Sequence, residues 1–284
     1  MARILIAGCG AVGILLGRLL AADGHIVWGL RRRVGALPPP LRSLWADLAD
    51  PTSLRALPEG IDYVFYMAAA GRFDDAAYQA AYVTGVTNLI GALQAQGQRP
   101  ARLFFTSSTG VYGQTHGEWV DEDSATEPPG FSGHRLLEGE RALHDGPYPA
   151  TVVRLAGLYG PEPGRLVEIV GAGRAVCPSG PPRYTNRVHR DDAAAALRHL
   201  MGLSSPPSLC IGVDDEPAEL ATVYRWLAIR LGAPEPPTGD PEEGLRPQGG
   251  NKRCRNQRLL ATGFTFRYPT FREGYGAMLA ALAP

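Results

Sequence analysis

The sequence predicts an α/β fold in which a doubly wound parallel sheet carries helices on both faces. In the first half of the chain, short apolar runs alternate with helical stretches, which is the pattern of parallel strands joined by helices. A glycine-rich turn directly follows the first apolar run. Beyond Leu155, proline and glycine become dense and the alternation lapses. We therefore expect a small, discontinuous C-terminal lobe beside the sheet.

The first element is a strand from Arg3 to Ala7, and the turn Gly8-Cys9-Gly10-Ala11-Val12-Gly13 and a helical stretch follow it. In such an arrangement Gly8 permits a tight turn, Gly10 lets the backbone approach a pyrophosphate, and Gly13 lets helix and strand pack closely. The helix N-terminus also offers unpaired N–H groups to an anion. The sequence thus predicts a Rossmann-type dinucleotide site that involves Gly8, Gly10, Ala11, Val12 and Gly13.

The second predicted strand, His25 to Leu30, is followed by Arg31-Arg32-Arg33. In dinucleotide-binding folds this position commonly holds an acidic residue that accepts a hydrogen bond from the adenine ribose 2′-hydroxyl. No acid stands there, and guanidinium groups suit a 2′-phosphate instead. We therefore expect NADP(H) to be favoured over NAD(H), with Arg31 and Arg32 as cofactor-binding residues. A solvated basic loop is the alternative.

The remaining elements follow in order along the chain. We expect strands around 43–46 and at 62–67, 101–107 and 150–155, and helices at 76–96, 188–201 and 218–231. Ligands of parallel sheets gather beyond the carboxyl ends of the strands, so Ala68, Ala69, Thr106 and Ser107 should face the cofactor. We predict a dinucleotide-binding domain at 1–155 and a mostly substrate-binding lobe at 156–284, with 186–212 returning to the first domain.

Composition excludes several classes of function. Lys plus Arg equals Asp plus Glu at 28 each, which argues against a nucleic-acid groove or a membrane-surface patch. Four cysteines stand far apart without metal-binding spacing, so we expect reduced thiols and no metal site. The chain shows neither a basic-then-apolar leader nor an apolar run of membrane-spanning length. These features favour a cytoplasmic protein with a small-molecule partner and no nucleic acid or membrane partner.

Several motifs in the same order resemble one known family. The stretch 107–113 (SSTGVYG) is similar to its Ser-Ser-x-x-Val-Tyr-Gly motif, 154–161 (RLAGLYGP) to its Arg-x-x-x-x-Tyr-Gly-Pro motif, and 186–194 (NRVHRDDAA) to its His-x-x-Asp segment. The chain thus resembles an extended short-chain dehydrogenase/reductase of the NAD-dependent epimerase/dehydratase family. The stretch 251–256 (NKRCRN) resembles the small nucleoside-diphosphate-sugar epimerase-like members of bacteria.

The resemblance implies an NAD(P)-binding oxidoreductase or epimerase that acts on a polar carbonyl or nucleotide-sugar substrate, and a homodimer formed through two helices of the first domain. It places Asp47 near the adenine, with Leu48 beside it. The residues that its motifs place near the substrate are Thr109, Tyr112, Tyr159 and His189. We also expect Tyr184, which lies outside these motifs, near the substrate. From the residues alone, we expect Arg154 to form an internal ion pair rather than a substrate clamp.

The chain departs from the family at the catalytic pair. Family catalysis uses a Tyr and a Lys four residues later, while a Ser or Thr hydrogen-bonds the substrate oxygen. Ser108 has the place of that hydroxyl. Where the pair should fall, the sequence reads PGFSGHRLLE at 129–138. One register gives Phe131 for Tyr and Arg135 for Lys, and a shift by one residue gives Ser132 and Leu136.

Three explanations of this gap remain open. In the first, Ser132 or Ser108 acts with His134, which titrates near neutral pH, while Arg135 holds ribose hydroxyls. In the second, a tyrosine from elsewhere, Tyr184 or Tyr112, enters the site. In the third, the protein binds NADP(H) without turnover, as a sensor or partner-binding module. We rank reductase or epimerase-like chemistry first, with Ser108, Ser132, His134 and Arg135 as its catalytic residues.

Overall fold

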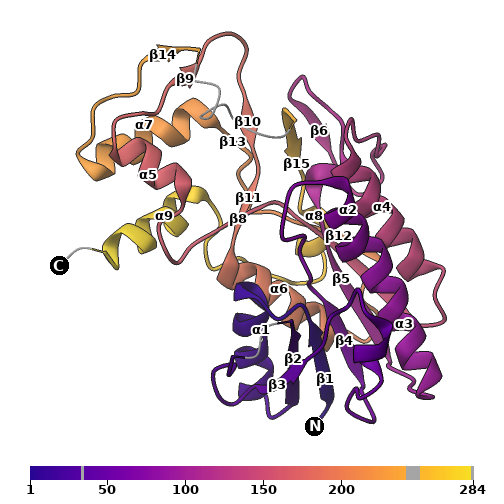
Figure 1. The fold of residues 1–284 in the computed structure, drawn as a ribbon. Helices are drawn as coiled ribbons and strands as arrows, with labels where there is room; N and C mark the ends of the chain where they lie inside the picture. The colour runs from indigo at the N-terminus through magenta and orange to yellow at the C-terminus, as the bar shows by residue number, and fades with distance from the viewer. Residues whose placement is uncertain (33–34, 241–249, 283–284) are drawn as a thin grey trace.

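The structure is a computed structural model, and it describes residues 1–32, 35–240 and 250–282. A layered α/β body holds a central sheet, and a smaller lobe with α5, α7 and α9 lies to one side of it (Figure 1). The central sheet has seven parallel strands in the order β12-β7-β5-β4-β1-β2-β3. These strands are β1 (Arg3–Ala7), β2 (Ile26–Arg31), β3 (Arg42–Trp45), β4 (Tyr63–Tyr66), β5 (Arg102–Ser108), β7 (Ala150–Leu155) and β12 (Leu209–Gly212).

The sheet is covered on both faces. Ile4, Leu5, Ile6 and Ala7 of β1 are all fully buried, although successive side chains of a strand point to opposite faces. The chain runs from β1 outward to β3 and then returns to β4 on the other side of β1. In open α/β sheets a crevice for ligands forms outside the carboxyl ends of the strands at such a reversal. The predicted Rossmann-type fold is confirmed.

Helices form the two outer layers. On one face, α1 (Ala11–Ala22) and α6 (Arg190–Gly202) pack together, with Leu16 and Leu197 in one apolar core with Ile6. On the other face, α3 (Gly85–Ala95) and α4 (Phe131–His144) cover the sheet.

The run before α3 consists of α2 (Asp75–Tyr78) and a π-helical turn, η2 (Gln79–Thr84). The long helix predicted at 76–96 is therefore present as a helical run, but a π turn interrupts it.

Two helices begin later than the periodicity predicted. Residues Arg187–His189 form strand β11, which pairs with β8 (Gly157–Tyr159), and α6 begins only at Arg190. His189 has extended backbone angles, and its Nδ1 accepts a hydrogen bond from the Asp191 N–H, so it caps the helix. Similarly, Ala218–Glu219 is strand β13 in front of α7 (Leu220–Leu231). Apolar periodicity alone does not distinguish the strand residues that directly precede a helix from the first residues of the helix.

The C-terminal lobe has its own apolar core. Helices α5 (Arg165–Gly171), α7 and α9 (Phe271–Ala280) meet around buried side chains such as Val223 and Leu227. The remaining short elements are η1 (Pro51–Leu54), η3 (Thr109–Val111), β6 (Glu118–Val120), β9 (Cys177–Pro178), β10 (Tyr184–Thr185), β14 (Thr238–Gly239), β15 (Lys252–Cys254) and α8 (Gln257–Leu260).

Between β11 and β13, which lie before and after this segment, the chain returns from the lobe to the layered α/β body. There β12 lies beside β7, and α6 packs against α1. The proposed domain boundaries stay a prediction. Within the described part of the chain, no helix has both the length and the apolar character needed to cross a membrane.

A buried charge network joins α4 to the sheet. Arg154 of β7 donates through Nη2 and Nε to the Glu140 carboxylate, at 2.6 and 3.0 Å, and both residues are almost fully buried. Ser107 Oγ donates to the same carboxylate at 2.6 Å, and Arg154 Nη1 donates to the Tyr112 hydroxyl at 2.8 Å. The predicted internal ion pair of Arg154 is confirmed. The network links α4, β5, β7 and the segment after η3.

We expect Glu140→Gln to lower the free energy of unfolding by about 3–5 kcal/mol, because the change leaves the Arg154 guanidinium buried without a counter-charge. Urea denaturation followed by circular dichroism measures this loss. Glu138→Gln is the matched control, since Glu138 lies on the same helix and accepts only from the partly exposed Arg135; its expected loss is below about 1 kcal/mol. Equal losses in the two variants would contradict the prediction.

Candidate functional site

The glycine turn brings the ends of three strands together. Gly8 has a φ of +87°, and a Cβ there would collide with the backbone nitrogen of Ala68. The N–H groups of Gly8 and Cys9 both donate to the Leu30 carbonyl at 3.0 Å. Because of these contacts the turn after β1 lies against the ends of β2 and β4. This position therefore requires glycine for both its conformation and its close packing.

The N-terminus of α1 is open toward the crevice. Gly10 is its N-cap residue, no side chain caps the helix, and no acid lies in its first turn. A Cβ at Gly10 would meet only the Gly8 carbonyl oxygen, at 4.0 Å. Ala11 is exposed, Val12 is buried, and Gly13 packs against Ile6. The first N–H groups of a helix have no intrahelical partners, so this terminus fits a pyrophosphate.

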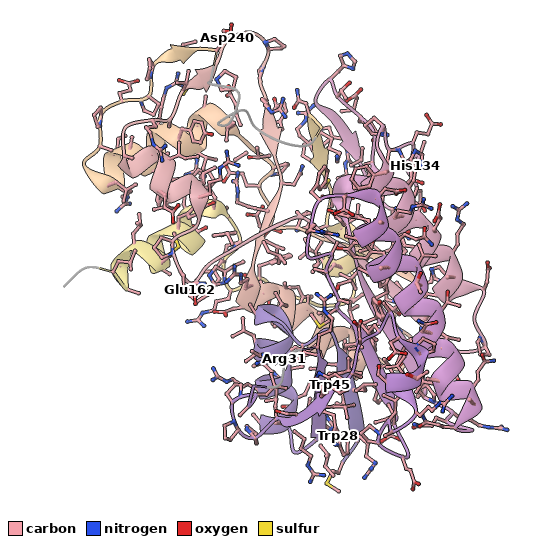
Figure 2. All side chains as sticks on the ribbon, in the orientation of Figure 1. Trp28, Arg31, Trp45, His134, Glu162 and Asp240 are labelled. Atoms are coloured by element: carbon pink, nitrogen blue, oxygen red, sulfur yellow. The ribbon has the colours of Figure 1, made fainter. Side chains whose placement is uncertain are left out.

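Two arginines stand at the end of β2. Arg31 Nη2 donates to the Gly35 carbonyl at 3.3 Å, while its Nε is buried and has no hydrogen-bond partner among the described residues. Figure 2 shows Arg31 at the edge where Trp45 of β3 also lies. Arg32 is exposed, and its Nη2 lies 3.7 Å from the Cβ position of Gly71, so it reaches toward the segment after β4. Arg33, also part of the predicted basic end, lies outside the described residues.

The other predicted cofactor residues differ in how far they face the crevice. The Asp47 carboxylate accepts the Ala49 N–H at 3.0 Å, and Leu48 is buried in the core. Ala68 is partly buried and Ala69 is exposed after β4.

The hydroxyls at the end of β5 are used inside the protein. Thr106 donates to the Tyr66 carbonyl at 3.3 Å, and Ser107 donates to Glu140. Their O–H donors are therefore engaged within the protein, and these hydroxyls can only accept hydrogen bonds from a cofactor.

Ser108 and Ser132 lie on neighbouring turns. Ser108 ends β5, is partly buried, and accepts the Gly110 N–H at 3.0 Å as the cap of η3. The first turn of α4 packs against this segment, since a Cβ at Gly133 would lie 3.0 Å from the Gly110 carbonyl oxygen. Ser132 is partly buried in that turn. The structure thus brings these two predicted hydroxyls to the same edge of the sheet.

Neither register of the catalytic pair supplies a Tyr or a Lys side chain. The Phe131 ring packs against Phe73 and Tyr78, with centroids 5.1 and 5.4 Å away. Arg135 donates to both oxygens of Asp75, at 2.8 and 2.9 Å, and to Glu138 at 2.8 Å. In the shifted register, Leu136 is buried in an apolar cluster with Val111. The N–H groups of Arg135 are thus largely engaged by carboxylates of α2 and α4.

His134 does not join the two serines. Gly133 and Leu136 form part of the buried face of α4, whereas His134 is exposed, and Figure 2 shows it on the outer side of the helix. The helical phase directs its ring away from β5. The structure therefore does not bring His134 to Ser108, as the first of the three explanations requires.

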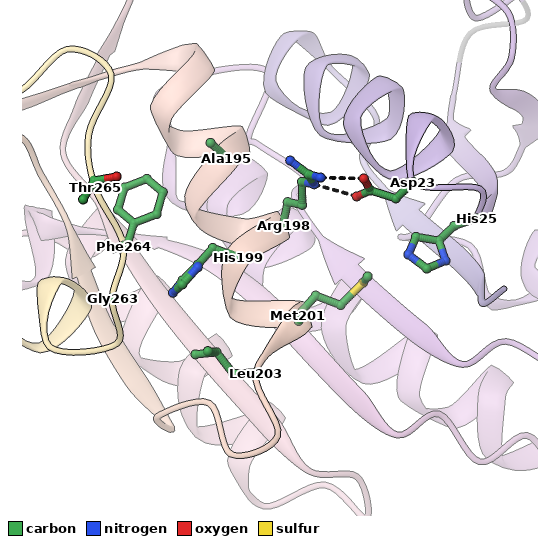
Figure 3. A pocket seen from close by; sticks show the side chains of 11 residues that line it. Asp23, His25, Ala195, Arg198, His199, Met201, Leu203, Gly263, Phe264 and Thr265 are labelled. Atoms are coloured by element: carbon green, nitrogen blue, oxygen red, sulfur yellow. Dashed lines mark hydrogen bonds and ion pairs between the residues drawn. The ribbon is translucent and has the colours of Figure 1, made fainter.

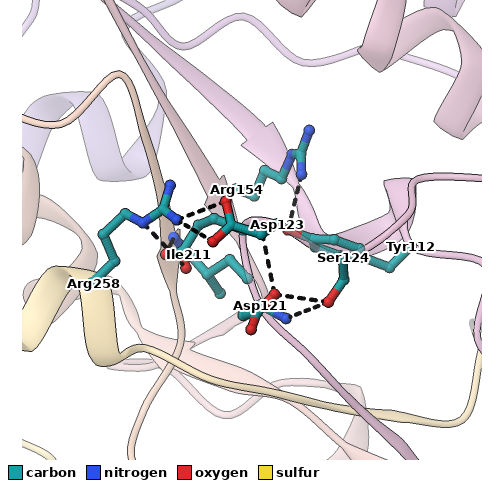
Figure 4. A network of polar contacts seen from close by, with 8 residues as sticks. Tyr112, Asp121, Asp123, Ser124, Arg154, Ile211 and Arg258 are labelled. Carbon is teal, nitrogen blue, oxygen red and sulfur yellow. Dashed lines mark hydrogen bonds and ion pairs between the residues drawn. The ribbon is translucent and has the colours of Figure 1, made fainter.

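Tyr112 and Tyr184 are placed by other contacts. Tyr112 is 1 % exposed, and its hydroxyl accepts from Arg154 (Figure 4), so it fills the core instead of facing a substrate. Tyr184 lies in β10 with the Arg253 guanidinium 4.6 Å from its ring centroid. The same guanidinium lies over Trp119 at 4.8 Å. For Tyr112 the expected substrate contact is therefore incompatible with its burial.

The other predicted substrate residues lie at or near the junction with the lobe. His189 is 2 % exposed, its ring packs at a tilt against that of Tyr268 with centroids 4.2 Å apart, and burial lowers its pKa. The Tyr159 hydroxyl is buried, and no described residue forms a hydrogen bond with it. Thr109 is buried in η3. Asp192 accepts the N–H groups of Arg267 and Tyr268, at 2.8 and 2.9 Å, which fastens the C-terminal segment to α6.

Sequence reasoning missed some residues near the crevice. Tyr78 and Tyr82 project from the helical run after β4, and Tyr82 packs against Phe105 of β5. Their four-residue spacing directly after the Ala68-Ala69 segment was the available signal. The acidic residues at 121–123 stabilise the fold. Buried Glu122 accepts the Ile211 N–H at 2.8 Å, and Asp123 forms an ion pair with Arg258 (Figure 4).

A separate surface groove of about 640 Å³ lies at the other end of the sheet (Figure 3). Asp23 and His25 line it on one side and His199 and Phe264 on the other, and Arg198 pairs with Asp23 across it. These residues lie at the amino end of β2 and the carboxyl end of α6. The groove is therefore distinct from the crevice beside the glycine turn.

Comparison with known proteins agrees with this geometry. The model of the NAD dependent epimerase/dehydratase family matches residues 4–173. Protein YeeZ of Escherichia coli (strain K12) is 32 % identical, with 95 % of this chain and 97 % of that protein covered. A solved structure from Methylobacillus flagellatus, named as a candidate NAD-dependent epimerase/dehydratase, is 36 % identical, with 99 % and 98 % covered and a TM-score of 0.82.

A more distant solved structure shares the fold. The Bordetella bronchiseptica enzyme WbmG in complex with NAD is 20 % identical, with 98 % of this chain and 93 % of that chain covered and a TM-score of 0.81. The family match spans the glycine turn, β4, Ser108 and α4. The chain belongs to the NAD-dependent epimerase/dehydratase family.

Proposed function

We propose that the protein binds NADP(H) across the carboxyl ends of β1, β4 and β5, and acts as an epimerase or reductase on a polar carbonyl compound or a nucleotide sugar. The observation that carries this proposal is the uncapped N-terminus of α1, where the space over Gly10 is open. When bound, the nicotinamide group supplies a reversible hydride acceptor. The complex of WbmG with NAD, on a similar fold, supports a dinucleotide ligand.

The preference for NADP(H) rests on the end of β2. A buried donor without a partner destabilises a protein by about 1–3 kcal/mol, and the Arg31 Nε is such a donor. A 2′-phosphate beside it supplies an acceptor with the charge that a guanidinium binds best. Arg32 adds a second, exposed guanidinium close to Gly71.

Ser108 is the residue that we propose to orient the substrate oxygen. Its Oγ accepts the Gly110 N–H, so its own O–H remains free to donate. Such a donor stabilises negative charge that develops on an oxygen in the transition state. Ser132 presents a second hydroxyl from the first turn of α4. Together they offer hydrogen bonds to a polar substrate, while neither is a strong acid or base.

A second candidate function is cofactor binding without turnover. The contacts of Phe131 and Arg135 favour it, because the phenyl ring cannot donate a proton and the guanidinium is held by Asp75 and Glu138. Under this alternative the protein senses NADP(H) or presents it to a partner.

The proposal also includes a cytoplasmic location and a homodimer. The four cysteines are unpaired and buried, which supports a reducing compartment. The homodimer rests on the family resemblance alone.

We expect Gly10→Val to abolish dinucleotide binding, because the new side chain fills the space meant for the pyrophosphate, while the thermal stability stays close to that of the wild type. Gly8→Ala is the contrasting variant. It should lower stability, because it forces a residue with a Cβ into positive φ and against Ala68. Calorimetric titration and thermal melts measure both effects. Normal cofactor binding by Gly10→Val would place the phosphates elsewhere.

Fluorescence titration should show that NADPH binds at least tenfold more tightly than NADH, a difference of about 1.4 kcal/mol. Arg31→Ala or Arg32→Ala should remove most of this difference, since each deletes a guanidinium at the end of β2. Arg18→Ala, an exposed arginine on α1, is the control and should leave the ratio unchanged. Equal affinity of the wild type for both cofactors would refute the preference.

If the protein turns over, Ser108→Ala should lower kcat about a hundredfold, the effect of one lost transition-state donor, with nearly unchanged cofactor affinity. The assay follows NADPH absorbance with a panel of carbonyl compounds and nucleotide sugars. The decisive comparison uses the double variant Phe131→Tyr, Arg135→Lys. An inert wild type beside an active double variant supports the non-catalytic alternative, whereas an active wild type that loses its rate in Ser108→Ala supports catalysis.

A further inference from the structure

The helical run after β4 contains a local irregularity with a clear cause. Residues Gln79–Thr84 form a π-helical turn between α2 and α3. The hydroxyl of Tyr66, at the end of β4, donates to the Ala81 carbonyl, and a Cβ at Gly85 would collide with that hydroxyl. Single π turns are rare within helical runs and are frequent at functional sites. Here the turn lies directly after the segment that the cofactor is expected to contact.

The π turn places Tyr82 between three elements of the crevice. Its ring lies 6.5 Å from the Phe105 ring of β5 and 5.2 Å from that of Tyr78. Its carbonyl oxygen abuts α4 at Gly139, where a Cβ would collide with it. The backbone N–H of Ala70, in the segment after β4, lowers the pKa of Tyr82 against the larger effect of burial. The phenol is thus fixed beside the carboxyl ends of β4 and β5.

The hydroxyl of Tyr82 can serve as a donor. A phenol carries one O–H, and no hydrogen bond from the Tyr82 O–H is found among the described residues. Burial and the neighbouring Tyr78 raise the pKa of Tyr82, so the group stays protonated at neutral pH. On the facing part of α4, Arg135 is engaged by carboxylates and Leu136 is apolar. Tyr82 therefore offers the crevice a hydrogen-bond donor that these two side chains do not.

We propose that Tyr82 binds the ribose next to the nicotinamide by donating its O–H to a ribose hydroxyl oxygen. The inference rests on the proposed dinucleotide function. In this role Tyr82 is a cofactor-binding residue that enters from the helix after β4, and α4 is left to position it through the contact at Gly139. The π turn then determines how far the Tyr82 side chain reaches into the crevice.

The test compares Tyr82→Phe with Tyr78→Phe by NADPH fluorescence titration. Tyr82→Phe should raise the Kd about tenfold, or about 1.4 kcal/mol, because it removes only the hydroxyl. Tyr78 is the matched control, since it lies one turn earlier in the same aromatic cluster and packs against the rings of Phe73, Phe131 and Tyr82. Tyr78→Phe should change the Kd less than twofold.

A fragment ligand separates this inference from the proposed function. Adenosine 2′,5′-bisphosphate carries the adenosine end and lacks the nicotinamide ribose, so Tyr82→Phe should bind it like the wild type. If the wild type prefers NADH, then NADH and adenosine diphosphate replace these two probes. A wild type that binds neither cofactor refutes the proposed function. Unchanged NADPH affinity in Tyr82→Phe, or an equal loss for the cofactor and its fragment, refutes the role of Tyr82.

Discussion

The buried ion pair between Glu140 and Arg154 is the interaction on which the ligand-facing edge of the sheet depends. It joins a helix of one outer layer to an inner strand, and its remaining hydrogen bonds go to Ser107 and the Tyr112 hydroxyl. A buried ion pair of this kind adds little net stability, but removing one of its two residues strongly destabilises the fold. Its main effect is therefore geometric, because it allows one relative position of α4 and β5. The serines at 108 and 132 depend on that position.

At the two registers in which the sequence places the catalytic pair, α4 presents no Tyr or Lys side chain to the crevice. It carries instead the Phe131 ring, which packs against α2, and an arginine engaged by Asp75. These contacts fasten the segment after β4 to α4. The hydroxyls that we propose for ligand binding lie at the end of β5, in the first turn of α4 and in the helical run after β4.

The features that the sequence predicted best are those with a local cause. The glycine turn, the basic end of β2 and Ser108 are set by backbone conformation and strand position, so a short stretch of sequence contains the whole signal. The position of Tyr112 is different, because Arg154 and the core decide where its hydroxyl points. The π turn is equally hidden, since it arises where Tyr66 of a strand meets Gly85 of a helix.

The outward direction of the His134 side chain can be predicted from the sequence. Gly133, Leu136 and Glu140 lie on one side of a helix, and simple helical phase places His134 on the other side. By contrast, no phase argument locates His189, whose ring is enclosed by Tyr159 and Tyr268 from distant parts of the chain.

The edge strand β12 has a consequence for how the protein is made. It reaches the sheet only after the chain has passed through the lobe, and Leu259 and Phe264 enter the same core later still. A nascent chain that ends near residue 173, where the family match stops, leaves β7 as an open edge and β1 without α6. Exposed edges of this kind pair readily with other chains. The contacts that cover this edge and this face of the sheet are therefore available only after the later part of the chain has been made.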